Sequence, residues 1–397
     1  MALLAPLRAL HALDFGVFLF WFFVVSATLL AAASFRGERK RAEYVCSRLA
    51  ESRPEFTPRV ALIVPVKGRD EGLKENLASL ATLDYPNYAL TVVARAAADI
   101  PPGVLPSGVR VVFAGSNGDD TGEKVQNLLA AVRSTRKPTD VLAFADSDGR
   151  AGPGWLRALV TPLEDLGVGA STGYRWYAPD PPSFWPLVRS VWNAAIAGGF
   201  GPGDNRFAWG GAMAIRKTTF DEARVTEFWE GSVSDDYGLT DAVKAAGLTV
   251  AFAPGAMVAS TDRTTAAEFF SWARRQLTIA RVHDPRLWWT ALAAHMIYCG
   301  AMAAAVLAIA NGRTAAEWAL VVQLGLGMLK GANRATLAKA ELPAFQSWFD
   351  RYGWVHSIWV PFVTWIWLVT LIGSAFGNTI EWRGNRYLLT RERAAKL

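Results

Sequence analysis

Apolar residues form one long run near the start of the chain and several near its end. The first run, Leu13 to Phe35, holds roughly 23 residues without a charge after Asp14, which is enough to cross a bilayer as a helix. It is too long for the apolar part of a signal peptide and no small-residue cleavage site is clear, so we predict a signal anchor. Four basic residues follow at once: Arg36, Arg39, Lys40 and Arg41. Their charge places the next domain in the cytoplasm.

Between residues of about 55 and 265, short apolar runs alternate with helical patterns, as in an α/β domain with a largely parallel sheet. The predicted strands are 60–64, 88–93, 109–113 and 141–145, and the predicted helices are 73–83 and 123–132. The strand that ends at Ala145 runs directly into Asp146.

After His283 the chain becomes apolar again. The later runs are 287–310, 318–328 with an extension towards 337, and 355–376. Phe184 to Phe200 is aromatic and apolar but too short to span, so we predict an interfacial segment there. We therefore divide the chain into an anchor (1–36), an α/β domain (55–283), C-terminal transmembrane or interfacial helices (284–380) and a basic tail (381–397).

The number of spans leaves a topological question. One span before the cytoplasmic domain and three after it would put the C-terminus outside. Five basic residues indicate instead that it is inside: Arg383, Arg386, Arg391, Arg393 and Lys396. Either one late segment is re-entrant or interfacial, or another pairs as a hairpin. We favour the cytoplasmic C-terminus, in a multi-pass protein of a bacterial inner membrane.

Composition agrees with a membrane protein. Hydrophobic residues make up 52% of the chain and charged residues 19%, below the roughly one quarter typical of soluble domains. The net charge of +6 indicates cytoplasmic loops and contact with anionic lipid. No basic stretch has the features of a nucleic-acid-binding module. Two distant cysteines and four scattered histidines favour neither a disulfide framework nor a zinc site.

Three polar clusters fall where ligands bind in open α/β sheets, beyond the carboxyl ends of strands. They are Lys67-Gly68-Arg69-Asp70-Glu71, Lys124 with Asn127, and Asp146-Ser147-Asp148. A nucleotide diphosphate needs a hard cation such as Mg²⁺ or Mn²⁺, which prefers carboxylates. Asp146 and Asp148 can supply one metal ligand and one ribose or sugar contact. The alternative for such a pair is a polar surface turn.

A second acidic cluster, Ser234-Asp235-Asp236-Tyr237, precedes a predicted helix that runs to Ala246. Acidic residues at this place can simply cap the helix. They can also act as a general base, because attack of a hydroxyl on a sugar's anomeric carbon requires a carboxylate to take the proton. We choose Asp236 over Asp235 for this role.

Two further motifs allow a functional and a structural interpretation. Gly210 and Gly211, after Trp209, let the backbone approach a ligand closely, although glycine pairs also make tight turns. Arg275 and Gln276 precede the membrane segments, where a guanidinium could neutralise phosphate oxygens or anchor to lipid headgroups.

Taken in order, these motifs resemble family 2-like glycosyltransferases, and more narrowly the ceramide glucosyltransferase (family 21) group. The resemblance covers most of the chain. The segments that carry it are Val64-Pro65-Val66-Lys67-Gly68-Arg69-Asp70, Leu83-Asp84-Tyr85-Pro86-Asn87-Tyr88, Lys124-Val125-Gln126-Asn127-Leu128, Asp146-Ser147, Asp236-Tyr237 and Trp382-Arg383-Gly384-Asn385-Arg386-Tyr387.

The resemblance implies a GT-A fold and inverting transfer of a hexose, glucose first, from a UDP-sugar to a lipid hydroxyl, with ceramide the best-known acceptor. The residues that would line the nucleotide pocket are Pro65, Lys67, Asp70, Lys124 and Asn127. Asp146 and Asp148 would hold the metal and donor, and Arg275 with Gln276 would close over the diphosphate or the acceptor.

The chain departs from the family pattern at two places. The family usually has an aspartate just after the second strand, in contact with the nucleotide base, whereas here only the displaced Asp99 could serve. The family's (Gln/Arg)-x-x-Arg-Trp motif aligns with residues 272–276, which keep Arg275 but lose both flanking residues. These changes leave the donor base and sugar open, and they also admit a hopanoid or glycerolipid acceptor.

Two other functions fit the same fold. A processive polysaccharide synthase would need more spans and normally an intact Gln-x-x-Arg-Trp motif. An inactive membrane scaffold would bind UDP with a metal and not turn it over.

Overall fold

The structure is a computed structural model that describes residues 4–51, 56–68, 70–115, 121–135, 138–203, 207–390 and 394–396, with side chains from Gly16 to Thr390. Arg69, Arg391 and Arg393, named above, lie outside these residues.

The α/β domain is built on a seven-stranded sheet of order β3-β2-β1-β4-β8-β6-β9. Its strands are β1 (Val60–Pro65), β2 (Tyr88–Ala94), β3 (Arg110–Phe113), β4 (Val141–Ala145), β6 (Val168–Thr172), β8 (Ala212–Arg216) and β9 (Thr249–Phe252). All neighbours pair in parallel except β8, which is antiparallel to both β4 and β6. The predicted mixed α/β class is confirmed, and the four predicted strands begin and end within about one residue of the observed ones.

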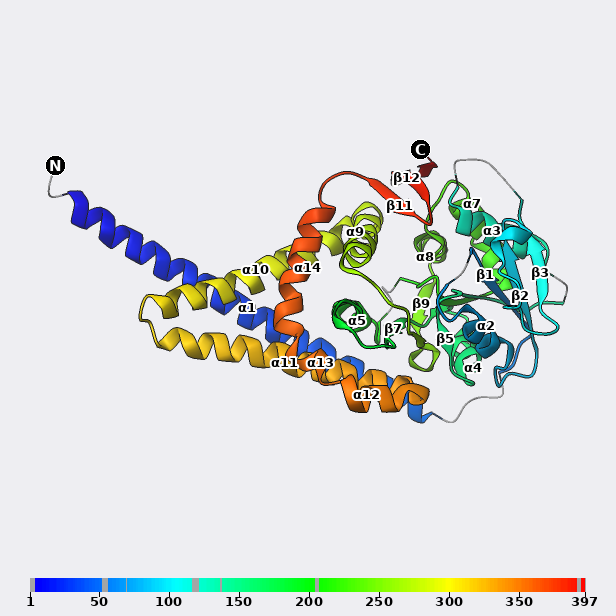
Figure 1. Ribbon diagram of the computed structural model, residues 1–397, viewed down its shortest axis with the longest axis horizontal. Helices are drawn as coiled ribbons and strands as arrows, with labels where there is room; N and C mark the ends of the chain where they lie inside the picture. Colours follow the sequence, from blue (N-terminus) through cyan, green and yellow to red (C-terminus); the bar gives the residue numbers. More distant parts are fainter. Residues whose placement is uncertain are drawn as a thin grey trace.

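Helices cover both faces of this sheet (Figure 1). One face packs against α2 (Leu73–Ala81) and α4 (Trp155–Val160). The other face packs against α3 (Glu123–Arg133), α7 (Val225–Trp229) and α8 (Asp235–Ala245), with α6 (Lys217–Glu222) beside them. Because helices cover both faces of the sheet at its centre, the run from Val141 to Ala145 is buried throughout, and its residues are apolar on both faces.

Two small sheets border the site. One has the order β5-β10-β7, with β5 (Arg150–Ala151), β7 (Arg175–Tyr177) and β10 (Val258–Ser260). The other has the order β11-β12-β13, with β11 (Thr379–Trp382), β12 (Asn385–Leu389) and β13 (Ala394–Lys396). The β11–β12 hairpin lies against the α/β domain, although the chain reaches it only after all the apolar helices (Figure 1).

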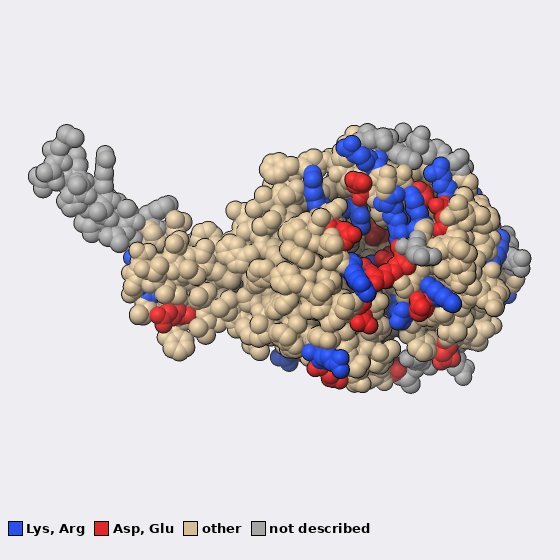
Figure 2. All heavy atoms as spheres, in the orientation of Figure 1, with Lys and Arg blue, Asp and Glu red and all other residues tan. Residues whose placement is uncertain are grey.

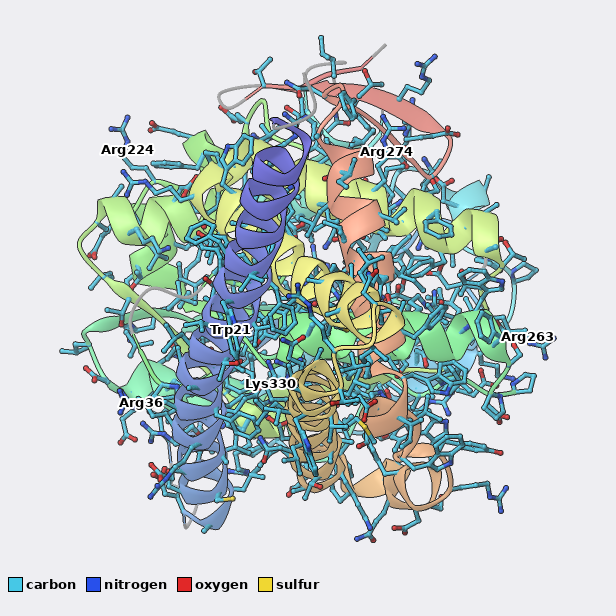
Figure 3. All side chains as sticks on the ribbon, turned by 90° about the vertical axis from the view of Figure 1, so that its left-hand side faces the viewer. Trp21, Arg36, Arg224, Arg263, Arg274 and Lys330 are labelled. Carbon is cyan, nitrogen blue, oxygen red and sulfur yellow. The ribbon has the colours of Figure 1, made fainter. Side chains whose placement is uncertain are left out.

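The long helices α1 (Leu4–Ala50), α10 (Pro285–Ala310) and α11 (Ala315–Glu341) extend together away from the α/β domain. Among the described helices, Gly16–Ala50 and Pro285–Ala310 are long and apolar enough to cross a membrane by length and composition. Figure 3 views them from the α1 end, with Trp21 and Arg36 on α1 and Lys330 on α11 beside it. Salt bridges tie α1 to α11 close to the α/β domain, Arg41 to Glu341 at 3.0 Å and Glu38 to Arg334 at 2.6 Å.

A layer of shorter helices lies between the three long helices and the sheet. It contains α5 (Phe184–Ala197), α9 (Ala266–His283), α12 (Gln346–Tyr352), α13 (Val355–Ile358) and α14 (Val360–Ser374). In Figure 1, α14 runs across the direction of α1 and α10. The run 355–376, which the sequence leaves as either a span or an interfacial segment, is divided near Trp359, and the longer of its two helices is α14, with 15 residues.

The segment Phe184 to Phe200, predicted to be interfacial, lies within this layer. α5 is buried along most of its length and packs against α9 and α14, with Trp192 stacked on Trp367 at 4.0 Å. Only the first residues of α5 are exposed, and Phe184 is 49% exposed. An aromatic, apolar segment has the same composition whether it faces lipid or other helices, so the sequence pattern did not distinguish the two.

Candidate active site

A cavity of about 900 Å³ lies between the α/β domain and the helical layer. One end is polar and receives the residues that follow β1 and β4 and those that begin α3 and α8. The other end is largely apolar and is lined from α5, α9, α10 and α14 by Ile196, Leu277, Ala280, Leu287, Trp288, Ala291, His295, Trp367 and Leu371. Figure 2 shows Lys, Arg, Asp and Glu gathered around a hollow in the α/β half, next to an almost uncharged helical half.

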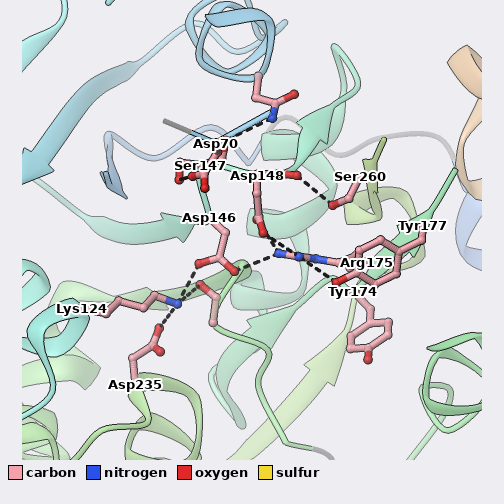
Figure 4. A network of polar contacts seen from close by, with 12 residues as sticks. Asp70, Lys124, Asp146, Ser147, Asp148, Tyr174, Arg175, Tyr177, Asp235 and Ser260 are labelled. Carbon is pink, nitrogen blue, oxygen red and sulfur yellow. Dashed lines mark hydrogen bonds and ion pairs between the residues drawn. The ribbon is translucent and has the colours of Figure 1, made fainter. Parts of the chain in front are cut away.

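The Asp146-Ser147-Asp148 turn lies where β1 and β4 end side by side, at the point where the strand order reverses, which is where ligands bind in open α/β sheets. Neighbouring segments fix the turn (Figure 4). Ser147 Oγ donates to Asp70 Oδ2 at 2.6 Å, and Asn76 donates to the Ser147 carbonyl at 3.1 Å. Ser260 Oγ donates to the Asp148 carbonyl at 2.8 Å. The two carboxylates are therefore held in place and face the cavity.

Lys124, at the start of α3, joins the two acidic clusters that the sequence singled out. Its Nζ lies 2.8 Å from Asp146 Oδ1 and 2.9 Å from Asp235 Oδ2. Burial opposes its charge, but the two carboxylates outweigh it and raise the pKa of Lys124. In the same way, burial raises the pKa of Asp146, whereas Lys124 and Arg175 lower it by more. Both groups are therefore charged at neutral pH.

Arg175, at the start of β7, is the principal site residue that sequence reasoning missed. Its guanidinium donates to both oxygens of Asp148, at 2.6 and 2.8 Å, and to Asp146 Oδ2 at 3.2 Å. It lies over the Trp209 ring, 4.9 Å from the centroid. The available signal was an arginine within a run that is otherwise aromatic and apolar, since an arginine is rarely buried without a partner.

The two aspartates at the start of α8 differ in their surroundings. Asp235 is 3% exposed and paired with Lys124, and burial raises its pKa to about 6. Asp236 is half-buried and faces the cavity. Its Oδ1 accepts hydrogen bonds from Ser234 Oγ and, at 2.8 Å, from the Tyr237 N–H. Among the described residues these bonds leave Oδ2 available to a ligand.

Gly210 and Gly211 are required by the packing of the site itself. A Cβ on Gly210 would lie 2.4 Å from Asp235 Oδ2, and one on Gly211 would lie 2.1 Å from the Trp209 ring and 2.7 Å from Asp146 Oδ2. Gly210 also accepts a hydrogen bond from Lys124 at 3.4 Å. Both glycines line the cavity, so no larger residue fits beside the carboxylates.

The β11–β12 hairpin covers the polar end of the cavity. Arg383, at its turn, donates to Asp70 Oδ1 at 2.7 Å and to the Lys67 carbonyl at 2.8 Å. Asn385 donates to Glu123 Oε2 at 3.0 Å, and Lys67 pairs with the same oxygen at 2.6 Å. The segment predicted as a basic tail is therefore part of the site wall, and it lies on the same side as the α/β domain.

The remaining predicted site residues divide into two groups. Pro65, Asn127, Arg275 and Gln276 line the cavity, where Arg275 lies over the Trp382 ring at 5.7 Å. Asp70 stands behind the wall, in contact with Ser147 and Arg383. Asp99 does not line the cavity, because its carboxylate accepts from the Ala96 N–H at 3.1 Å and caps its own short turn.

The carboxylates fit a divalent metal in kind. Among the described residues no three His, Cys, Asp or Glu side chains form a complete metal cage. A nucleotide-bound Mg²⁺ needs only one or two protein carboxylates, since phosphates and water supply the other ligands. Asp146 and Asp148 can supply these carboxylate ligands once the Arg175 guanidinium no longer binds Asp148.

Comparison with known proteins found one family and several structures. The model of glycosyl transferase family 21 matches residues 19–395. The mannosyltransferase PcManGT from Pyrobaculum calidifontis, in complex with GDP-Man and Mn²⁺, is 17% identical; the match covers 89% of this chain and 97% of that one, with a TM-score of 0.45. Glucosyl-3-phosphoglycerate synthase from Mycobacterium tuberculosis, with Mn²⁺, UDP and glucosyl-3-phosphoglycerate, is 16% identical over 58% of this chain and 85% of that one, with a TM-score of 0.39. The comparison with curated proteins found no match.

Proposed function

The chain belongs to glycosyl transferase family 21, a glycosyltransferase of the GT-A type as its sequence indicated, and from this we propose that it transfers a hexose from a UDP-sugar to the hydroxyl of a membrane lipid. Glucose is the favoured sugar and a ceramide-like lipid the favoured acceptor, with glycerolipids and hopanoids as the alternatives.

The observation that carries this proposal is the two-ended lining of one cavity. The Asp146–Asp148 turn and Asp236 line one end, and side chains of α10 and α14 line the other. α10 is one of the two helices within the described residues that are long and apolar enough to span a membrane. A lipid can therefore keep its chains in apolar surroundings among these helices while its polar headgroup reaches the carboxylates. A soluble acceptor would have no use for the apolar end.

The arrangement of the helices supports a multi-pass topology with three crossings. α1 leads to the α/β domain, α10 leads away from it and α11 returns (Figure 1). α14 is then an interfacial helix, which leaves the β11–β12 hairpin beside the α/β domain. Arg36, Arg39 and Lys40 are exposed near the domain end of α1, so the positive-inside bias assigns the domain to the cytoplasm.

For the donor, we assign the diphosphate and its metal to the Asp146–Asp148 turn. A bound Mg²⁺ or Mn²⁺ supplies the positive charge that stabilises the departing UDP. Lys124 keeps Asp146 ionised, while Lys67 and Asn127 line the nucleotide end of the cavity. Arg275 and Gln276, from α9, stand on the wall towards the helical layer, where they can contact the diphosphate or the acceptor.

For the chemical step, Asp236 is the general base. It accepts the proton of the lipid hydroxyl while the oxygen forms its bond to the anomeric carbon and the bond from that carbon to the UDP oxygen breaks. Ser234 and the Tyr237 N–H hold Oδ1, which orients Oδ2 for the proton. A single displacement of this kind inverts the anomeric configuration.

The proposal is tested by mass-resolved transfer with the purified full chain in lipid nanodiscs. A panel of UDP-sugars is offered with Mg²⁺ or Mn²⁺, together with ceramide, diacylglycerol and hopanoid acceptors. We expect one hexose to be added to one lipid class, with loss of activity on chelation and inverted configuration by NMR. UDP binding without transfer to any lipid would favour the scaffold, and a polymeric product would favour a synthase.

A further inference from the structure

Arg175 holds the two carboxylates that a metal would use. Its side chain is 11% exposed, and its guanidinium binds both oxygens of Asp148 as a fork. The same group reaches Asp146 Oδ2 at 3.2 Å, on the opposite oxygen from the one that Lys124 contacts. Figure 4 shows this arrangement, with Arg175 on one side of the turn and Lys124 on the other.

The two cations are not equivalent. Lys124 keeps Asp235 as a partner if Asp146 turns towards a ligand. For the Asp148 carboxylate, Arg175 is the only ion-pair partner within the described residues, and it engages both oxygens. Since an arginine stays protonated at any physiological pH, a metal reaches Asp148 only after the guanidinium has moved. The hold of Arg175 on Asp148 therefore competes directly with the metal.

The surroundings of Arg175 offer the guanidinium a place to remain after it moves. It lies over the rings of Trp209 and Tyr177, at 4.9 and 5.5 Å, and donates to the Tyr177 hydroxyl at 3.1 Å. Its Nε is buried and has no hydrogen-bond partner among the described residues. A phosphate group in the cavity could accept from Nε or from the released fork, since a guanidinium matches phosphate in geometry as well as in charge.

We propose that the Arg175 guanidinium binds Asp146 and Asp148 in the free protein and moves to the donor diphosphate when the nucleotide and metal enter. Divalent metal therefore binds poorly on its own and binds well only together with the nucleotide. This inference rests on the proposed function for the identity of the nucleotide. Each ligand then strengthens the binding of the other by the same factor, because linkage is reciprocal. The consequence is a site that binds divalent metal only weakly until a donor is present.

The test measures Mn²⁺ binding to the full chain in nanodiscs by the loss of the free Mn²⁺ EPR signal, with and without UDP. Arg175→Gln removes the charge and the fork. We expect it to tighten Mn²⁺ binding without UDP by about tenfold or more, the effect of losing one strong competing contact, and to reduce the gain that UDP confers. Arg189→Gln is the matched control, since Arg189 also lies over Tyr177, at 4.1 Å, but pairs with Asp262; it should leave Mn²⁺ affinity unchanged.

Every outcome decides the inference. Equal or weaker Mn²⁺ binding by Arg175→Gln without UDP would overturn it. If that variant folds only with Mn²⁺ present, the metal is replacing the lost cation, as proposed. If it does not fold at all, Arg175→Lys decides: a single ammonium cannot grip both oxygens of Asp148, so tighter Mn²⁺ binding is expected and unchanged binding contradicts the inference. Failure of UDP to bind any form would instead overturn the proposed function, while the Mn²⁺ comparison without UDP would still stand.

Discussion

The two ends of the cavity are held together by different forces. At the polar end, Lys124, Arg175 and Arg383 bind carboxylates at 2.6–3.2 Å, and each contact has a direction. At the apolar end, flat rings pack on one another, as Trp192 does on Trp367 with an interplanar angle of 5°. Directional contacts discriminate strongly between ligands, whereas apolar packing discriminates by size and shape. We therefore expect donor selection to be strict and acceptor selection to be graded.

The largest expected effect comes from the polar end. Asp236→Asn removes the proposed proton acceptor and keeps the side-chain shape, so transfer should fall by about a hundredfold to ten-thousandfold. UDP affinity, measured by calorimetry with Mn²⁺, should stay within about threefold. Asp221→Asn, at an exposed site on α6, serves as the control. Turnover close to that of the wild type would remove Asp236 from the role of base.

The second effect tests the apolar end alone. Ala291→Phe fills the cavity from α10, and overpacking of this kind costs about 1–3 kcal/mol. Lipid transfer should fall by about ten- to a hundredfold, with an effect that grows with acceptor size, while UDP binding remains unchanged. Ala293→Phe is matched in size and helix but is exposed. If both variants transfer equally well, the acceptor does not use this end.

A smaller effect is expected where the hairpin meets the polar end. Arg383→Ala removes the contacts to Asp70 and to the Lys67 carbonyl, but Arg383 is 36% exposed and solvent screens part of the ion pair. The KM for the UDP-sugar should rise by about three- to tenfold with little change in kcat, and Arg383→Lys should recover part of the loss. Arg386→Ala, on the exposed side of the same hairpin, is the control. An unchanged KM would show that the hairpin does not position the donor site.

The smallest effect is a pH dependence of stability. The pKa of Asp235 is raised from 3.8 to about 6, mainly by burial. Between these values the unfolded chain has lost the proton and the folded chain has kept it, so this group's contribution to stability falls as the pH rises from about 4 to about 6. Asp235→Asn should remove that fall from the profile of Tm against pH, measured by tryptophan fluorescence. Superimposable profiles would contradict the assignment.

The sequence predicted the polar end far better than the apolar one. Val60–Val64 and Val141–Ala145 are buried strands that stop at polar residues, and parallel strands bring their carboxyl ends together. That alone places Lys67 near Asp146. Arg175 was not predicted because it begins β7, whereas its partners Asp146 and Asp148 follow β4. Only the tertiary fold brings these two segments together.

The apolar end could not be predicted because its walls come from three separate stretches of the chain, namely α5, the consecutive helices α9 and α10, and α14. Apolar composition predicts helices that avoid water, and it is the same for a helix against lipid and a helix against helices. For that reason the sequence predicts α5 only as an interfacial segment, and it leaves open whether the run that contains α14 spans the membrane or lies at its interface. The sequence does not predict that the hairpin returns to the polar end of the cavity, since a basic C-terminus also fits a simple cytoplasmic tail.

The central claim is that a lipid reaches the carboxylates from the membrane end of one cavity. The most direct test is photo-crosslinking of the full chain in nanodiscs with a ceramide that carries a diazirine in its acyl chain, followed by peptide mapping. We predict labelling of cavity residues on α10 and α14, such as Trp288 and Trp367, reduced by Ala291→Phe and not by Ala293→Phe. Labelling confined to outward residues such as Trp289 and Trp365, which are 63% and 40% exposed, would contradict the account.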